Sequence, residues 1–396
     1  MSYPSSKKRF LFATLTALAT WGLVCMGGLV TSKGVGMSVP DWPTSFGYNM
    51  FALPIAQWFH GGVFDEHTHR LWASSVGLLL VFLTRWLGGV QSRKPMIAIG
   101  IAEVVGGLLL MLLGPDWKGA GHFLSGIGGV VLLAGMVWAR NPTSEGVLPQ
   151  LGWAAFWLVQ AQGLLGGLRV VLDKVFLGNV TMGTLLGMLH GCSGQAFFVL
   201  LGVIALLTSP GWSRFRAVPS AGLDRVRPWI GIALGFVALQ LVLGACMRHQ
   251  HAGLAIPDFP RAYGQWWPAT DIDSLLRYNQ RRLDESVVTR FQIQLQMFHR
   301  VGAVMACLLV LHVFASSLRR LGWGSVLTRG AAVWAGLVLI QFTLGMFTIW
   351  TNKAADVATA HVAVGAALLL TGTMLILVAR KHTMAVSTSD ELRQQS

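Results

Sequence analysis

The sequence predicts an all-α polytopic membrane protein with two pseudosymmetric four-helix bundles in tandem and an inserted helix pair. Three observations support this prediction: the composition, a series of long apolar segments, and an internal repeat. Hydrophobic residues make up 54% of the 396 residues and charged residues only 12%, whereas soluble domains carry about 25% charged residues. So little charge favours a chain that crosses the bilayer repeatedly.

Ten apolar segments are long enough to cross a bilayer, which takes about 20 residues. The 47 glycines fit the close helix packing that is common in lipid. We therefore predict about ten transmembrane helices, over residues 10–32, 67–89, 96–114, 120–139, 151–171, 181–207, 229–247, 291–317, 329–350 and 357–380.

Lysine and arginine concentrate at the chain ends and in short loops that an even number of spans places on one face. Because such loops stay in the cytoplasm, we expect both termini there and a bacterial cytoplasmic (inner) membrane as the location. The first apolar segment lacks a convincing cleavage site, so we expect it to be retained as a helix. The net charge of +14 follows from these loops and does not indicate nucleic acid.

The internal repeat is marked by two similar segments, PDWPTSFG at 40–47 and PDFPRAYG at 257–264. In each copy the next span opens with His-Arg, a later span carries a Gln-x-x-x-Gly motif, and the span after that carries a histidine. Because both copies have the same topology, this is a parallel repeat. The matched residues are His69-Arg70 with His299-Arg300, Gln162 and Gly166 with Gln341 and Gly345, and His190 with His361.

The first copy is longer than the second. Its two histidines are 121 residues apart, against 62 in the second copy, and the surplus is enough for an extra helix pair. We therefore expect an N-terminal bundle, an inserted hairpin within it, a cytoplasmic linker, a C-terminal bundle and a polar tail. Their ranges are 1–207, about 91–149, 208–228, 229–381 and 382–396.

The repeated histidines predict two haem sites in the outer half of the membrane. Ionisable side chains inside spans are costly and usually functional, and two imidazoles from facing helices commonly ligate a haem. One alternative is that each histidine only bonds a neighbouring carbonyl, which the duplication disfavours. Zinc is another, but each pair lacks two further ligands, and the four cysteines stand at unrelated spacings. We assign iron ligation to His69 with His190, and to His299 with His361.

Three further ionisable residues are not repeated. His312 is 13 residues after His299, about 20 Å along the helix, but no histidine stands at the matching positions of the partner spans, so we expect a structural role. Glu103 and His122 lie in the inserted hairpin. A structural role is the favoured interpretation for both, and proton relay is the alternative for Glu103.

One difference between the copies predicts different roles. Three residues before the first histidine stand Glu66 in one copy and Gln296 in the other, and residues at i and i+3 share a helix face. A carboxylate beside a redox cofactor can accept a proton or stabilise a developing cation, whereas glutamine can do neither. We expect a reaction centre in the half with Glu66 and an electron-transfer centre in the other. The alternative is an acid favoured by the helix dipole, as we expect for Asp65.

Four basic residues are candidates for binding haem propionates, since anionic groups attract paired donors. Arg70 and Arg300 follow the first histidine of each copy, and hydrogen bonding to helix ends is their alternative role. Arg169 and Lys353 flank the outer ends of the Gln-x-x-x-Gly spans.

The PDWP loop, the Glu66-x-x-His69-Arg70 motif and the further histidine-bearing spans together resemble the heme A synthase family. The resemblance covers nearly the whole chain except 91–149. It implies eight core helices in two pseudosymmetric bundles, and oxidation of a methyl group of heme O to the formyl group of heme A by successive hydroxylations. It also implies a resident b-type haem (heme b) on His299 and His361, heme O as substrate at His69 and His190, and a catalytic role for Glu66.

The partners implied are heme O synthase, cytochrome oxidase assembly factors and an unidentified electron acceptor, with a homo-oligomer as a further possibility. The sequence departs from the family pattern in its inserted helix pair and in its first outer loop. Many bacterial members carry a cysteine pair in that loop, where this chain has Ser38 and Ser45. Two other functions stay open: a membrane cytochrome b that passes electrons between quinol and an outer partner, and a haem carrier or transporter.

Overall fold

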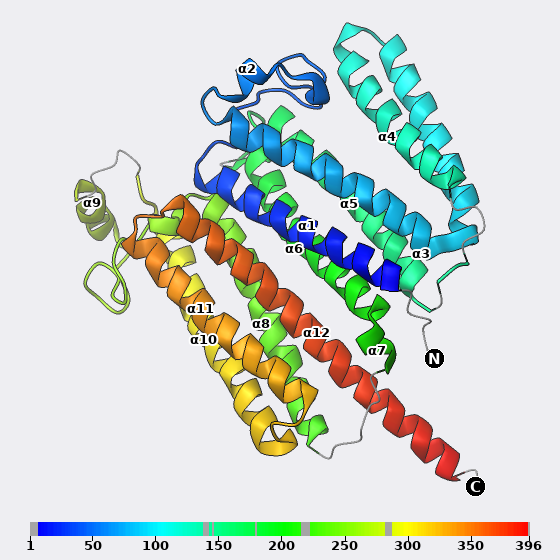
Figure 1. Cartoon of the computed structure of the whole chain (residues 1–396). Helices are drawn as coiled ribbons and strands as arrows, with labels where there is room; N and C mark the ends of the chain where they lie inside the picture. Colours follow the sequence, from blue (N-terminus) through cyan, green and yellow to red (C-terminus); the bar gives the residue numbers. More distant parts are fainter. Residues whose placement is uncertain are drawn as a thin grey trace. The chain divides into compact units, whose positions relative to one another are not determined.

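The computed structural model describes residues 7–137, 142–144, 146–178, 180–214, 222–281 and 287–394, without the side chains of 213, 214 and 382–394. The chain is 79% helical, and nine helices among the described residues are long and apolar enough to cross a membrane. The predicted class, an all-α polytopic membrane protein, is confirmed. The chain divides into two compact units, Met1–Arg214 and Phe215–Ser396 (Figure 1), and the division falls within the predicted linker 208–228.

The first unit contains a closed ring of four helices in which each helix packs on two others. Buried side chains of the ring form one apolar cluster, which includes Leu80, Leu83, Leu201 and Ile204. The ring consists of α1 (Lys7–Ser32), α3 (Val63–Leu112), α5 (Leu148–Val171) and α6 (Met182–Thr208). The shorter elements are η1 (Met50–Ala52), α2 (Ile55–Trp58), η2 (Pro115–Trp117), β1 (Phe176–Leu177), β2 (Val180–Thr181) and α7 (Pro210–Arg214), and β1 pairs antiparallel with β2.

The second unit has a ring with the same order of contacts. Trp334, fully buried at its centre, donates its indole N–H to the backbone oxygen of Leu368 at 2.9 Å, so this large ring is buried without an unpaired donor. The ring consists of α8 (Leu223–His249), α10 (Arg290–Leu321), α11 (Val326–Trp350) and α12 (Ala355–Gln394). The shorter elements are η3 (Ala252–Leu254) and α9 (Ile272–Gln280), and α12 extends through most of the predicted tail.

Two predicted spans, 67–89 and 96–114, form the single helix α3, which breaks at Gly89 with φ 50° and ψ −140°. Nine helices therefore contain the ten predicted spans. Only glycine adopts such dihedral angles at low cost, and a Cβ at this position would lie 2.5 Å from the carbonyl carbon of Pro142. Thr143 donates its hydroxyl to the Gly88 oxygen at 3.1 Å, and the buried Arg85 donates to the oxygens of Gly89 and Ala134. These bonds satisfy carbonyl groups near the break, as an apolar environment requires.

Beyond the break, the second half of α3 pairs with α4 (Lys118–Met136) to form a helical hairpin, drawn in cyan in Figure 1. The predicted insertion, about 91–149, corresponds to this hairpin. Glycines at heptad spacing let the two backbones approach closely: a Cβ at Gly100 would lie 2.5 Å from the amide of Leu132, and one at Gly107 would lie 2.5 Å from the oxygen of Gly121. The start of α4 lies near the loop before α3, so the second half of α3 runs back toward the end at which the first half begins.

Candidate functional site

Each of the four predicted ligand histidines packs its ring against a glycine of a neighbouring helix. A Cβ added at that glycine would lie 3.1 to 3.5 Å from the histidine Cε1, so a larger side chain would displace the ring. The absence of a side chain therefore provides the space in which each imidazole lies. The four pairs are Gly27 with His69, Gly166 with His190, Gly244 with His299, and Gly345 with His361.

The glutamine of each Gln-x-x-x-Gly motif contacts the second histidine of its unit. With its amide oriented so that the oxygen accepts from Gly194 N, Gln162 donates to Nδ1 of His190 at 2.9 Å. In the second unit, Nε2 of Gln341 lies 3.3 Å from Nε2 of His361. The repeated glutamine thus orients one imidazole of each pair, and its partner glycine four residues later makes room for the same ring.

The donor set fits a haem. Within each unit the imidazoles are close enough to interact electrostatically, His69 with His190 and His299 with His361. Nδ1 of His69, His299 and His361 is buried without a hydrogen-bond partner among the described residues, although buried polar atoms normally have one. In the part of the chain that the structure describes, no group of three or more His, Cys, Asp or Glu side chains is placed to hold a metal ion. Paired imidazoles suit haem ligation better than tetrahedral zinc.

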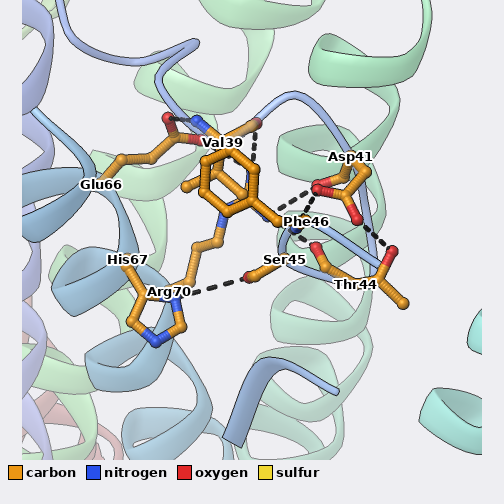
Figure 2. Close-up of polar contacts among 8 residues, drawn as sticks. All are labelled: Val39, Asp41, Thr44, Ser45, Phe46, Glu66, His67 and Arg70. Carbon is orange, nitrogen blue, oxygen red and sulfur yellow. Dashed lines mark hydrogen bonds and ion pairs between the residues drawn. The ribbon is translucent and has the colours of Figure 1, made fainter. Parts of the chain in front are cut away.

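Glu66 is buried and is directed to the first PDxP loop (residues 36–49), as Figure 2 shows. Its Oε2 accepts a hydrogen bond from the Val39 amide at 2.9 Å, and its Oε1 pairs with Arg70 at 2.7 Å. Arg70 also donates to the backbone oxygens of Val39, Asp41 and Thr44. Both side chains hold the loop on the start of α3. The guanidinium bonds backbone oxygens of the loop, whereas the alternative expected for it was bonding to helix ends.

The second unit repeats this arrangement without the negative charge. Gln296 accepts a hydrogen bond from the Ile256 amide at 2.6 Å and donates to the oxygen of Gly253 at 3.0 Å, both in the second PDxP loop (residues 253–266). Arg300 donates to the oxygens of Ile256 and Asp258, at 3.3 and 2.8 Å. Glutamate and glutamine therefore make the same contact with the loop, and they differ in charge and in the ion pair to Arg70.

The two PDxP loops have the same backbone conformation. In the first, the Asp41 carboxylate accepts hydrogen bonds from the amides of Phe46 and Gly47 at 2.7 and 2.8 Å. Burial opposes ionisation of Asp41, but these bonds and one from Thr44 lower the pKa of its carboxyl below the usual value. In the second loop, the Asp258 carboxylate accepts the equivalent bonds from the amides of Tyr263 and Gly264. Both loops also have a cis peptide bond before the second proline, Pro43 or Pro260, and a positive φ, 52° at Phe46 and 53° at Tyr263.

Known proteins resemble this chain over most of its length. Residues 121–373, well over half of the chain, match the COX15-CtaA family of cytochrome oxidase assembly proteins. The chain belongs to this family. It is similar to the Heme A synthase of Rhodospirillum centenum, with 26% identity over 91% of this chain and 87% of the relative. The Heme A synthase of Halalkalibacterium halodurans is 20% identical over 94% and 97%, and that of Rhizorhabdus wittichii is 24% identical over 90% and 89%.

In this COX15-CtaA family member, one of the predicted basic residues interacts with a histidine pair and another lies beside a second cation. Arg169, near the end of α5, interacts electrostatically with His69, His190 and Glu66. Lys353 lies in the turn between α11 and α12, where burial, and then the nearby Arg248, lower the pKa of its ammonium. A half-buried cation next to a second cation is suited to an anionic ligand.

The three unrepeated residues lie in different surroundings. Glu103 accepts a hydrogen bond from Gln160 of α5 at 2.9 Å, and its other oxygen is buried without a partner among the described residues. His122 is exposed on α4. His312 contacts Ser316 at 3.2 Å and the Trp229 ring at 4.6 Å, contacts of the kind expected for the structural role predicted for it.

Sequence reasoning missed a second polar difference between the copies. His67 is fully buried, with Nδ1 3.4 Å from the Ser45 hydroxyl. The matching positions in the second unit are Met297 and Ala262, both buried and apolar. The signal was present in the aligned repeat, since both members of the pair change together between the copies. His67 stands two residues before His69, so it lies on a different face of α3 and packs on the Trp58 ring.

Proposed function

We propose that this family member is a heme A synthase-like oxidoreductase, which oxidises a methyl group of heme O to a formyl group by successive hydroxylations. The observation that carries the proposal is the duplicated frame, in which two histidine pairs with equivalent glycine contacts differ in charge at Glu66 and Gln296. Relatives named Heme A synthase match along most of the chain, which supports the same conclusion.

The charge difference divides the roles. Heme O is the substrate in the N-terminal half, with His69 and His190 as its ligands. His299 and His361 would hold a b-type haem in the C-terminal half, and when bound this haem would supply electron transfer. Arg169 and Lys353 are suited to the propionates because each lies at a histidine pair or beside a second cation, whereas Arg70 and Arg300 are engaged by loop oxygens.

Glu66 would act as the acid–base group of the substrate half. Its carboxylate is fixed by the Val39 amide and by Arg70, one turn before His69 on the same helix. A fixed negative charge there stabilises positive charge that develops on the substrate during oxidation, and it can receive a proton released from the methyl group.

The test is Glu66→Gln, which gives the first unit the residue of the second. Glutamine makes the equivalent loop contact at position 296, so the loop is expected to stay in place. In cells that also express heme O synthase, we expect heme A in pigment extracts to fall at least ~100-fold, the low end of what acid–base catalysis contributes, while b-type haem is retained. Normal heme A from this variant would show that Glu66 only holds the loop.

His299→Ala provides the matched test of the other half. We expect loss of the bis-histidine spectrum of the resident haem, and an unchanged spectrum would reject this assignment. The similarity of the two frames also favours a second candidate, a membrane cytochrome b that oxidises quinol. Two equivalent, permanently bound b-type haems in a redox titration, without heme A, would support that function.

The location we infer is a bacterial cytoplasmic membrane with both termini in the cytoplasm, since the described helices fit a multi-pass protein and basic residues favour that face. Heme O synthase and cytochrome oxidase assembly factors are the expected partners, because the first supplies the substrate and the second group uses the product.

A further inference from the structure

The aromatic residue of each PDxP loop is supported differently in the two units. In the second unit, Phe259 packs against Phe342 and Trp350 of α11, with ring centroids 6.3 and 6.2 Å apart. In the first unit, the Trp42 ring packs over Gly167 of α5, where a Cβ would clash with it. Its aromatic neighbour is Phe123 of α4, at 5.4 Å with an interplanar angle of 65°, an edge-to-face arrangement that stabilises ring pairs.

The repeat register explains this difference. Matching Gln162 with Gln341 aligns Gly163 and Val171 of α5 with Phe342 and Trp350 of α11. Gly163 has no side chain, and nothing lies within 4 Å of a Cβ added there; Val171 is 56% exposed. The core helix of the first unit thus lacks both rings that support the loop of the second unit.

We propose that the inserted hairpin supplies the aromatic support for the first PDxP loop that α5 lacks, with Phe123 as a positioning residue for the substrate half. A second contact lies beside it, since a Cβ at Gly119 would be 2.9 Å from Cγ2 of Thr44. The hairpin is itself fixed to the ring of helices by the bond of Gln160 to Glu103 at 2.9 Å and by the bond of Arg85 to the Ala134 oxygen at 3.1 Å. This inference rests on the proposed function only for its catalytic consequence.

That consequence follows from the loop contacts. Trp42 lies between Asp41 and Thr44, whose backbone oxygens bind Arg70, and close to Val39, whose amide binds Glu66. A loop that opens more often would release Glu66 and expose the substrate half to solvent. A substrate that requires successive hydroxylations would then leave before the last one, so the partly oxidised alcohol would accumulate relative to heme A.

The structural test is hydrogen–deuterium exchange of the purified full chain, comparing peptides over 40–48 and 257–265. Phe123→Ala should raise exchange of the Phe46 and Gly47 amides roughly 2- to 10-fold, the size expected for loss of one aromatic pair. The second loop provides an internal control and should not change. Phe123→Leu, which keeps an apolar side chain, tests the ring alone if the alanine variant does not fold, and Phe123→Tyr should restore protection.

Leu109→Ala is the matched control on the same hairpin, because its side chain is 57% exposed and it should leave both loops unchanged. Unchanged exchange over 40–48 in the Phe123→Ala and Phe123→Leu variants, or an equal rise in both loops, would overturn the proposal. In cells with heme O synthase, the Phe123→Ala variant should raise the ratio of hydroxylated haem to heme A. If the unmodified chain forms no heme A, the proposed function fails, while the exchange result still decides whether the hairpin supports the loop.

Discussion

At the scale of single residues, the four glycines beside the histidines explain how imidazoles fit between packed transmembrane helices. Close helix packing normally leaves no room for a ring at the interface. The repeated glycine at each of the four positions removes a side chain where the Cε1 atom lies. Each histidine ring thus occupies space that a side chain on the neighbouring helix would otherwise fill. A larger residue at the glycine should therefore displace the imidazole.

Gly345→Val tests this on the half proposed to hold the b-type haem. A Cβ at Gly345 already lies 3.3 Å from Cε1 of His361, so valine should displace the ring and lower the b-type haem content of purified protein at least ~10-fold, the loss caused by about 1.4 kcal/mol in binding free energy. Gly336→Val, on the same helix with nothing within 4 Å of the added Cβ, is the control for helix propensity. Equal haem content in both variants would contradict the assigned role of Gly345.

The repeat allowed the histidines and the Glu66–Gln296 difference to be predicted, because both depend only on register. It did not predict where Glu66 points. Sharing a helix face with His69 suggested an orientation toward the haem, yet the carboxylate bonds Val39 in the loop, a contact across 27 residues of sequence. Local spacing gives no information about such a contact. Local spacing also could not predict the hydrogen bonds of Arg70. Its partners are backbone oxygens 26 to 31 residues earlier in the chain and Glu66, one turn earlier on the same helix.

At the scale of elements, the break in α3 divides one long helix into two helical segments that run in opposite directions. Apolar length predicted both spans, but the position of the break depends on Gly89 meeting Pro142 and Thr143, which are more than 50 residues away. Hydropathy alone therefore located the helices and left the turn between them undefined.

Gly89→Ala should be strongly destabilising. Alanine is strained at a φ of 50° and ψ of −140°, at a cost of about 1–3 kcal/mol, and its Cβ would also clash with the Pro142 backbone. We expect a lower apparent Tm of the detergent-solubilised protein. Gly129→Ala on α4, with open space around the added Cβ, should leave the Tm unchanged or raise it slightly. The expectation would be wrong if the two variants had the same apparent Tm.

At the scale of the whole chain, the duplicated frame carries two sites whose difference is small and local. The inserted hairpin belongs to the first unit alone, the unit with the charged residue Glu66 and the polar pair Ser45–His67. The polar departures from exact repetition thus gather in the first unit, while the second unit departs by the added helix α9 between its PDxP loop and α10. This asymmetry is what a duplicated haem protein needs if one half is to react while the other transfers electrons.

The number of spans fixes how the two units share the membrane. If the break in α3 reverses the chain across the bilayer, six spans separate the two PDxP loops, and both loops lie on the same, outer face. If α3 crossed only once, the loops would lie on opposite faces. Single cysteines at exposed loop positions distinguish these topologies in a background lacking the four native cysteines, Cys25, Cys192, Cys246 and Cys307.

Phe51→Cys and Trp266→Cys, at side chains 68% and 75% exposed, should both react with a membrane-impermeant maleimide in intact cells. Trp323→Cys, 58% exposed in the turn after Arg319 and Arg320, should react only after permeabilisation, because basic loops stay in the cytoplasm. Labelling of only one of the first two positions would contradict the ten-span topology. Labelling of Trp323→Cys alone in intact cells would reverse the orientation, and the histidine pairs would then lie in the cytoplasmic half of the membrane.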